Sequence, residues 1–394
     1  MILHLHTDSR FADYTISLFD QKDNHHLVGK RYPGQRLKYI SNHQNTEQYV
    51  FGWTNPKRLL KKLSPGAVIV HFLDIRWFEL IRELPTDVRV VWIFWGGDGY
   101  GLPKMKEGLL DPITASFASK LGSHSSKVDK MKAELGVDSI WQTAFWKSLV
   151  FEGVRKMKTT ASLDTIRLKL FERVDYCGTF LKEDYKLLKA HYDFKMDWVD
   201  ARFISLEQLI GSLEPVNPEG NNILLGNSCT MENNHVDAFE AINQLELIAG
   251  QQVICPLSYG KDMGSYRDLV IEEGNQKLGQ SFSPLMELMS INEYTKVLRS
   301  CSYAIMFHNR QQAFNNILAL VYLGVKVYLK PSNTIYTYLR RIGCEVCSTE
   351  ELRATKELKP LNEDEILRNR EALRKEFSQK MIRKSANSLL EKLT

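Results

Sequence analysis

The sequence has little of what marks several large classes of protein. Its 394 residues include six cysteines and carry a net charge of only +5. So few cysteines argue against a disulfide scaffold, and so small a charge is not typical of a dedicated nucleic-acid-binding protein. No apolar run reaches the length of a membrane span. The first residues have no basic region and no cleavage site, so we expect no signal peptide and a cytoplasmic protein.

The common nucleotide-binding fingerprints are also missing. Neither G-x-x-x-x-G-K-[ST] nor a strand-linked G-x-G-x-x-G occurs. There is no Asp-x-Asp pair either, so a metal-clamped diphosphate is not indicated, and we expect no metal and no cofactor. Cys344 and Cys347 form a single Cys-x-x-Cys without a second pair or nearby histidines, which only weakly favours a zinc or redox site.

What the sequence does contain is apolar material for a large core. Hydrophobic residues make up 43% of the chain, and its length fits two domains. Apolar strands alternate with amphipathic helices, a pattern typical of α/β domains with parallel sheets. We expect strands within 2–6, 26–29, 67–72, 88–95, 174–180 and 194–203, and then within 223–225, 252–256, 302–307 and 325–329.

A Pro- and Gly-rich segment divides these strands into two sets. Residues 213–221 contain two prolines and a glycine among polar residues, which predicts a linker. We therefore expect one Rossmann-like domain over 1–212, a second over 222–361 and a helix over 362–394. Thr7 or Asp8 would cap the first helix, Ser290 would begin a helix with a capping box, and Gly324 would end another.

Polar turns follow the strands of the second half. Gly226 can adopt backbone angles closed to other residues and would leave room for a ligand. Asn233 or Asn234 would cap the next helix. The alternative for this segment is an ordinary strand-to-helix turn.

Arg310 precedes another predicted helix, whose start offers free N–H groups and a partial positive charge. The alternative for Arg310 is a surface salt bridge. Because ligands bind at the carboxyl edge of parallel sheets, these turns predict a site for a nucleotide diphosphate. The expected donor-binding residues are Gly226, Asn227, Ser228, Tyr259, Arg310, Gln311 and Gln312.

A glycine-rich turn also follows the strand over 88–95. Gly96 and Gly97 allow the backbone to bend tightly beside an acceptor, and Asp98 could accept a proton from a sugar hydroxyl or orient it. The alternative is a plain turn aspartate.

Residues 104–172 combine basic and aromatic side chains. Trp146 lies in an aromatic segment that Arg155, Lys156 and Lys158 follow, a composition suited to an anionic membrane surface. The alternative is a core-facing apolar stripe with a solvated basic face.

Four of these segments together resemble a known family. Ile223 to Ser228 followed by Asn234-His235 is similar to the "ILVGNS…NEH" stretch of the TDP-Fuc4NAc:lipid II Fuc4NAc transferases. Arg310-Gln311-Gln312 with Gly324 resembles that family's "RQQ…AG(I/V)" segment. The sequence from Phe94 to Tyr100 resembles "WGADLY", and the Tyr259 turn resembles its "GY".

The resemblance implies a fold and an activity. It implies the GT-B fold, in which two Rossmann-like domains face a central cleft. The enzyme would move 4-acetamido-4,6-dideoxygalactose from dTDP to a polyprenyl-diphosphate-linked saccharide, as a peripheral protein on the inner face of the plasma membrane. Two alternatives remain: an NDP-sugar epimerase of GT-B type, and a non-catalytic nucleotide-sugar-binding protein.

Overall fold

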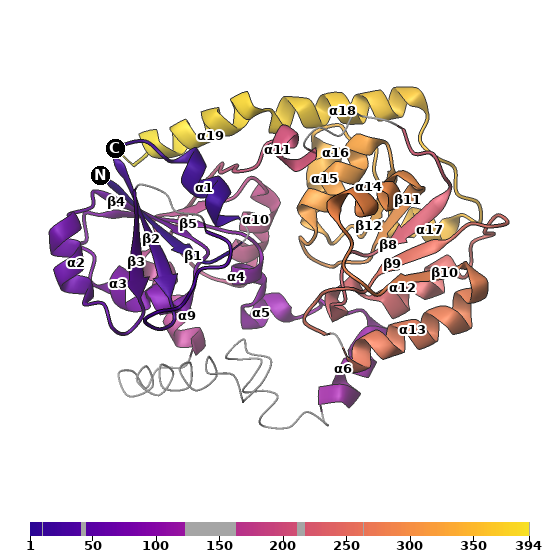
Figure 1. The fold of residues 1–394 in the computed structure, drawn as a ribbon, viewed down its shortest axis with the longest axis horizontal. Coiled ribbons are helices and arrows are strands. Elements are labelled where there is room, and N and C mark those ends of the chain that lie inside the picture. Colours follow the sequence, from indigo (N-terminus) through magenta and orange to yellow (C-terminus); the bar gives the residue numbers. More distant parts are fainter. Residues whose placement is uncertain (10, 41–44, 123–162, 211–216, 263, 394) are drawn as a thin grey trace. The chain divides into compact units, whose positions relative to one another are not determined.

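The computed structural model contains two compact units. It describes residues 1–9, 11–40, 45–122, 163–210, 217–262 and 264–393. Unit 1 comprises Met1–Met105, Ser125–Phe203 and Ile382–Thr394, and unit 2 comprises Lys106–His124 and Ile204–Met381. Each unit has one parallel sheet with helices around it (Figure 1). The predicted α/β architecture with parallel sheets is therefore confirmed.

The sheet of unit 1 has the order β3-β2-β1-β4-β5-β6-β7. Its strands are β1 (Ile2–Thr7), β2 (Asn24–Lys30), β3 (Thr46–Val50), β4 (Ala67–His71), β5 (Arg89–Ile93), β6 (Tyr176–Gly178) and β7 (Asp197–Val199). Its helices include α1 (Ala12–Leu18), α2 (Pro56–Leu63), α3 (Phe78–Arg82), α4 (Gly97–Tyr100), α9 (Leu163–Arg173) and α10 (Lys182–His191). The central strands β1, β4 and β5 are buried on both faces, which explains their nearly continuous apolar sequences.

The sheet of unit 2 has the order β10-β9-β8-β11-β12-β13. Its strands are β8 (Asn222–Leu225), β9 (Val253–Pro256), β10 (Phe282–Leu285), β11 (Cys301–Met306), β12 (Lys326–Leu329) and β13 (Cys347–Ser348). Its helices include α6 (Pro112–Gly122), α11 (Leu206–Ile210), α12 (His235–Ile242), α13 (Ser265–Leu278), α14 (Ile291–Arg299), α15 (Phe314–Leu323), α16 (Thr334–Arg341), α17 (Thr349–Ala354) and α18 (Glu363–Phe377). Because β8 and β11 are neighbours, the turns that follow them meet at one edge of the sheet.

Two local sequence signals act as predicted in unit 2. Ser290 caps α14, and Glu293 completes the capping box. Gly324 ends α15 in the left-handed region, with φ of +91°.

The beginning of α1 corrects one expectation. Phe11, and neither Thr7 nor Asp8, occupies the N-cap position of α1. The carboxylate of Asp8 instead accepts the backbone N–H groups of Lys38 and Tyr39, at 2.7 and 2.9 Å. The Asp8 side chain therefore binds the loop around Lys38 and Tyr39 and does not cap α1.

The C-terminal region corrects another expectation. It is not one long helix but two, α18 and α19 (Gln379–Glu391). Ser378 separates them because its backbone is extended, with ψ of 152°. The compact units also differ from the domain limits expected from sequence, since α6 belongs to unit 2 and residues 382–393 belong to unit 1.

The basic and aromatic segment is only partly described. Residues 123–162, which include Trp146, Arg155, Lys156 and Lys158, lie outside the described residues. In the parts of the chain that are described, no helix combines the length and apolar character needed to cross a bilayer.

Candidate active site

The candidate site lies at the carboxyl ends of β8 and β11 in unit 2. Gly226 follows β8 and has φ of +67°, a conformation that favours glycine. A Cβ atom at this position would lie 2.7 Å from Asn233 Oδ1 and 2.9 Å from His235 Nε2. Side chains of the same unit therefore fill the space on the Cβ side of Gly226, and its expected role in donor binding stays a prediction.

Asn233 connects the turn after β8 with the end of β11. Its Oδ1 accepts the N–H of Asn227 at 2.9 Å and bonds with His308 Nε2 at 2.8 Å. Its Nδ2 donates to Thr230 Oγ1 at 2.7 Å and to Ser228 Oγ at 3.3 Å. Asn233 thus fixes the shape of the turn rather than capping α12.

The structure brings together three of the turns singled out from sequence. Gln312 Nε2 donates to Asn227 Oδ1 at 3.3 Å and to Thr230 Oγ1 at 3.1 Å. Asn227 Nδ2 in turn donates to the hydroxyl of Tyr259 at 3.3 Å. Tyr259 remains 40% exposed, so its ring is accessible beside this hydrogen-bonded group.

Arg310 and Gln311 are half-buried just before α15. Arg310 Nη1 donates to the carbonyl oxygen of Gln311 at 2.9 Å. The charge of Arg310 also acts on Glu232. Burial of Glu232 raises its pKa, but the hydrogen bond from Lys261 and the positive charges of Lys261 and Arg310 lower it, and the net result is a pKa below the usual value. Arg310 therefore lies within electrostatic range of the turn after β8.

Several buried polar atoms at this edge have no hydrogen-bond partner in the part of the chain that the structure describes. They are Glu232 Oε2, His235 Nε2, His308 Nδ1 and Gln312 Oε1. Buried polar groups in folded proteins are nearly always paired, so this concentration makes the edge the candidate site for a polar ligand.

The two histidines at this edge are neutral at physiological pH. Burial lowers the pKa of His235 and of His308 to about 3. Asn233 Oδ1 accepts the hydrogen of His308 Nε2, which leaves His308 Nδ1 as a hydrogen-bond acceptor. His308 therefore offers an acceptor in the buried part of this edge, where its side chain is 0% exposed.

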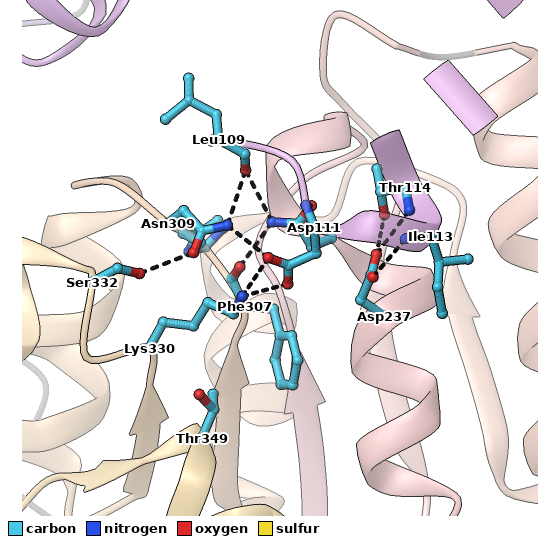
Figure 2. Close-up of polar contacts among 12 residues, drawn as sticks. Leu109, Asp111, Ile113, Thr114, Asp237, Phe307, Asn309, Lys330, Ser332 and Thr349 are labelled. Carbon is cyan, nitrogen blue, oxygen red and sulfur yellow. Dashed lines mark hydrogen bonds and ion pairs between the residues drawn. The ribbon is translucent and has the colours of Figure 1, made fainter. Parts of the chain in front are cut away.

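A second polar network holds residues 109–114 against the same strand ends (Figure 2). Asn234 Nδ2 donates to the carbonyl oxygens of Leu109 and Phe307, at 3.2 and 3.0 Å, and its Oδ1 accepts the N–H of Asp111. Asn234 occupies the N-cap position of α12, but its side chain makes no capping bond there. The expected capping role of Asn234 is therefore wrong, because its amide is used between segments.

The network continues through acidic side chains. The carboxylate of Asp237 accepts the N–H groups of Ile113 and Thr114, both at 2.9 Å, and thereby caps α6 (Figure 2). Asp111 forms a buried ion pair with Lys330, and Asn309 Nδ2 donates to Asp111 at 2.8 Å. The carboxylates of Asp111 and Asp237 therefore have hydrogen-bond donors, whereas the buried polar atoms at the edge beside Arg310 have no partners among the described residues.

Asp98 belongs to unit 1 and follows β5 in α4. Its Oδ2 accepts the N–H of Leu73 at 3.0 Å and Nε1–H of Trp92 at 2.6 Å, and its Oδ1 accepts the N–H of Trp95 at 3.2 Å. Burial raises its pKa to about 6 although these donors oppose the shift. The role of Asp98 in proton transfer stays a prediction.

The glycines beside Asp98 shape its turn. Gly96 has φ of +98° and stands at the N-cap position of α4. A Cβ atom on Gly97 would contact the ring of Phe72 at an ordinary 3.6 Å. Of these two positions, only that of Gly96 has a backbone conformation that favours glycine.

Cys344 and Cys347 are free thiols in the structure. Burial raises the pKa of Cys344 to about 12, so it stays protonated and unreactive at neutral pH.

Comparison with known proteins agrees with these observations. Residues 206–373 match the family described as 4-alpha-L-fucosyltransferase, glycosyl transferase group 56. This match contains the turns after β8, β9 and β11, and it confirms the resemblance seen in the sequence.

Solved structures support the fold. OtsA in its apo structure is similar with a TM-score of 0.60 at 10% identity, over 100% of this chain and 98% of that chain. WaaG, described as a glycosyltransferase involved in lipopolysaccharide biosynthesis, is similar with a TM-score of 0.52 at 11% identity, over 100% of both chains. The lipopolysaccharide outer core galactosyltransferase WaaB is similar with a TM-score of 0.57 at 8% identity, again over 100% of both chains. These likenesses identify a GT-B fold.

The chain therefore has the GT-B fold, and its residues 206–373 match the 4-alpha-L-fucosyltransferase family of glycosyl transferase group 56, which supports a glycosyltransferase.

Proposed function

We propose that this glycosyltransferase moves a fucose-like deoxy-amino sugar from a dTDP or related nucleotide-diphosphate carrier to a polyprenyl-diphosphate-linked saccharide. The observation that carries the proposal is the set of unpaired buried polar atoms near Arg310 at the ends of β8 and β11. A nucleotide sugar has the hydroxyls, carbonyls and phosphates that such atoms and a guanidinium bind.

The donor diphosphate would bind before α15. Arg310 offers a permanently charged, planar donor, and the first turn of α15 offers free N–H groups and the positive end of the helix dipole. Gln311 lies between them and adds amide donors. The diphosphate would be neutralised without a metal ion, since cations and a helix start supply the positive charge.

The nucleotide or donor sugar would lie against the turns after β8 and β9. Asn227, Ser228 and Gln312 offer polar atoms there, and the exposed ring of Tyr259 offers a surface for a base or sugar. Gly226 contributes indirectly, because it allows Asn233 and His235 to approach the turn.

The reaction would form one bond and break one. An acceptor hydroxyl attacks the anomeric carbon of the donor, and the bond from that carbon to the diphosphate oxygen breaks. The diphosphate leaves with the bonding electrons, which Arg310 and the start of α15 would stabilise. In the proposal, Asp98 takes the hydroxyl proton or orients the hydroxyl, and Gly96 and Gly97 border the acceptor.

A donor screen tests this function. The purified chain is incubated with dTDP-, UDP- and GDP-linked sugars, with and without a polyprenyl-diphosphate saccharide, and release of free nucleotide diphosphate is measured. We expect release that depends on the acceptor and on one donor class. Conversion of the donor without acceptor would favour an epimerase, and binding without any turnover would favour a non-catalytic protein.

The membrane part of the proposal concerns residues outside those described. Trp146, Arg155, Lys156 and Lys158 would lie on an anionic membrane surface on the cytoplasmic side of the plasma membrane. Sedimentation with vesicles is expected to show binding that rises with anionic lipid and falls with salt. Glu substitutions of the three basic residues should reduce it, and insensitivity to both treatments would exclude this surface.

A further inference from the structure

Four histidines gather on one face of the sheet in unit 1. His4 and His6 are two residues apart on β1, so their side chains project to the same face. The parallel register pairs His26 of β2 with His4, and His71 of β4 with His6. All four side chains are buried, with at most 5% exposed.

The ring nitrogens of these histidines meet in pairs. His4 Nδ1 lies 3.0 Å from His71 Nε2, and His6 Nε2 lies 3.0 Å from His26 Nδ1. One ligating nitrogen each from His4, His6 and His26 lie within 4.8 Å of one another.

The opposite nitrogens of three of these rings are held by oxygen atoms. This pattern is typical of metal-binding histidines, whose outer N–H is fixed by an oxygen acceptor so that the inner nitrogen presents its lone pair. The pairs are His4 Nε2 with Asn24 Oδ1 at 3.0 Å, His26 Nε2 with Phe19 O at 3.0 Å, and His6 Nδ1 with Thr15 Oγ1 at 3.5 Å.

The hydrogen bonds decide where the protons are. The carbonyl of Phe19 can only accept, so His26 carries its proton on Nε2 and has a lone pair on Nδ1. Thr15 donates its own hydrogen to Ala12 O at 2.9 Å, so it can act only as an acceptor for His6 Nδ1. Without a metal, His6 Nε2–H donates to His26 Nδ1 at 3.0 Å, and metal binding would move the His6 proton to Nδ1, where Thr15 Oγ1 can accept it.

We propose that His4, His6 and His26 form a structural site for one divalent first-row metal ion, with zinc as the best-suited occupant and His71 beside His4 Nδ1. Imidazole nitrogens bind zinc at about 2.0–2.1 Å, which places tetrahedral ligand atoms roughly 3.3 Å apart. The His6–His26 pair at 3.0 Å is close to this spacing, and the ligating atom of His4, within 4.8 Å of both, would move toward them on binding.

The burial of the side chains agrees with a structural role. His4, His6 and His26 are at most 1% exposed, so the site has no position open to solvent, whereas catalytic zinc sites keep an open position. The metal would join β1 and β2, and would take no part in diphosphate binding in unit 2.

Metal content tests the proposal. The full chain, without a polyhistidine tag, is produced with zinc in the medium, dialysed and measured by elemental analysis. We expect about one zinc per chain in the wild type and a several-fold lower content in His6→Gln and His26→Gln. His25→Gln is the matched control, because His25 is on β2 but on the opposite face, where it pairs with Glu47 at 3.4 Å.

A second measurement covers variants that fail to fold. The melting temperature of the wild type is compared in excess zinc and in chelator, since a ligand bound only by the folded state raises it. We also expect Asn24→Ala to weaken zinc binding about 10–100-fold, because Asn24 orients His4. A wild-type chain without zinc and with the same melting temperature in both conditions would overturn the proposal and leave a hydrogen-bonded group of neutral histidines.

Discussion

The turns after β5 in unit 1 and after β8 in unit 2 look alike in sequence but differ in how their polar groups are used. Each contains a glycine with positive φ, Gly96 or Gly226. In unit 1, Asp98 is buried and receives three N–H donors. At the edge around the turn after β8 in unit 2, four buried polar atoms remain without partners among the described residues. A glycine turn therefore does not by itself indicate a ligand site, whereas spare hydrogen-bonding capacity does.

This difference predicts two kinds of mutational effect. Changes in a fully paired network should reduce the free energy of unfolding, because they leave a partner unpaired. Changes beside the unpaired atoms should reduce ligand affinity and lower stability less. The predictions below test this division.

The largest effect is expected for Lys330→Ala. Asp111 would then be buried without its cation, which typically costs about 3–5 kcal/mol. Urea unfolding measures this loss. Lys326→Ala is the control, since Lys326 Nζ bonds an exposed carbonyl, and it should change stability by less than about 0.5 kcal/mol. Equal effects of both variants would show that the network around Asp111 contributes little.

Asp98→Asn separates a structural from a catalytic role. Folding raises the pKa of the Asp98 carboxyl from 3.8 to about 6 because the side chain is buried. The protonated carboxyl therefore stabilises the fold below pH 4, and this contribution, about 3 kcal/mol, is lost as the pH rises to 6. In unfolding experiments from pH 4 to 7, the free energy of unfolding of the variant should not show this decrease with pH. If Asp98 is the base, kcat should also fall by about 10²–10⁴. A normal kcat together with a changed pH dependence of the free energy of unfolding would show that Asp98 is a purely structural residue.

Arg310→Ala should weaken donor binding. Loss of a charge-assisted hydrogen bond costs about 1.5–3 kcal/mol, or roughly 10–150-fold in the dissociation constant of the nucleotide diphosphate. Calorimetric titration of the variant measures this. Arg340→Ala provides a matched control, because Arg340 is exposed and pairs with Glu345 at 3.7 Å. Unchanged affinity in a folded Arg310→Ala protein would remove Arg310 from the site.

The smallest effect is expected for Gln312→Ala. Its amide oxygen is unpaired in the described structure, but its Nε2 donates to Asn227 and Thr230, so the free energy of unfolding should fall by about 1 kcal/mol. Donor affinity should fall by about 0.5–1.5 kcal/mol, or roughly 2–12-fold, if the oxygen bonds the nucleotide sugar. A loss of stability without a loss of affinity would contradict the division between the two turns.

Sequence reasoning succeeded where the signal is local. The apolar strands, the Ser290 capping box and the left-handed Gly324 each depend on a few neighbouring residues, and all are present. The edge strands β3, β10 and β13 were missed because they are short and mixed in composition. Their strand character depends on the neighbouring strand, not on their own residues.

The polar site could be predicted only in part. The turns with Asn227, Tyr259 and Gln312 were found because each follows an apolar strand. The bond between Asn233 and His308 joins residues 75 positions apart, and no local pattern predicts it. Asn234 was misassigned for the same reason, since its partners on Leu109 and Phe307 are distant in sequence.

The division of the chain into units has a consequence for synthesis. Residues 382–393 belong to unit 1, where Ser385 accepts the N–H of Arg202 and donates to Asp200 O, and Leu389 is 1% exposed. Unit 2 is encoded mostly between them and the rest of unit 1. During translation, therefore, all residues of unit 2 are made before residues 382–393, and unit 1 stays incomplete until α19 has been synthesised.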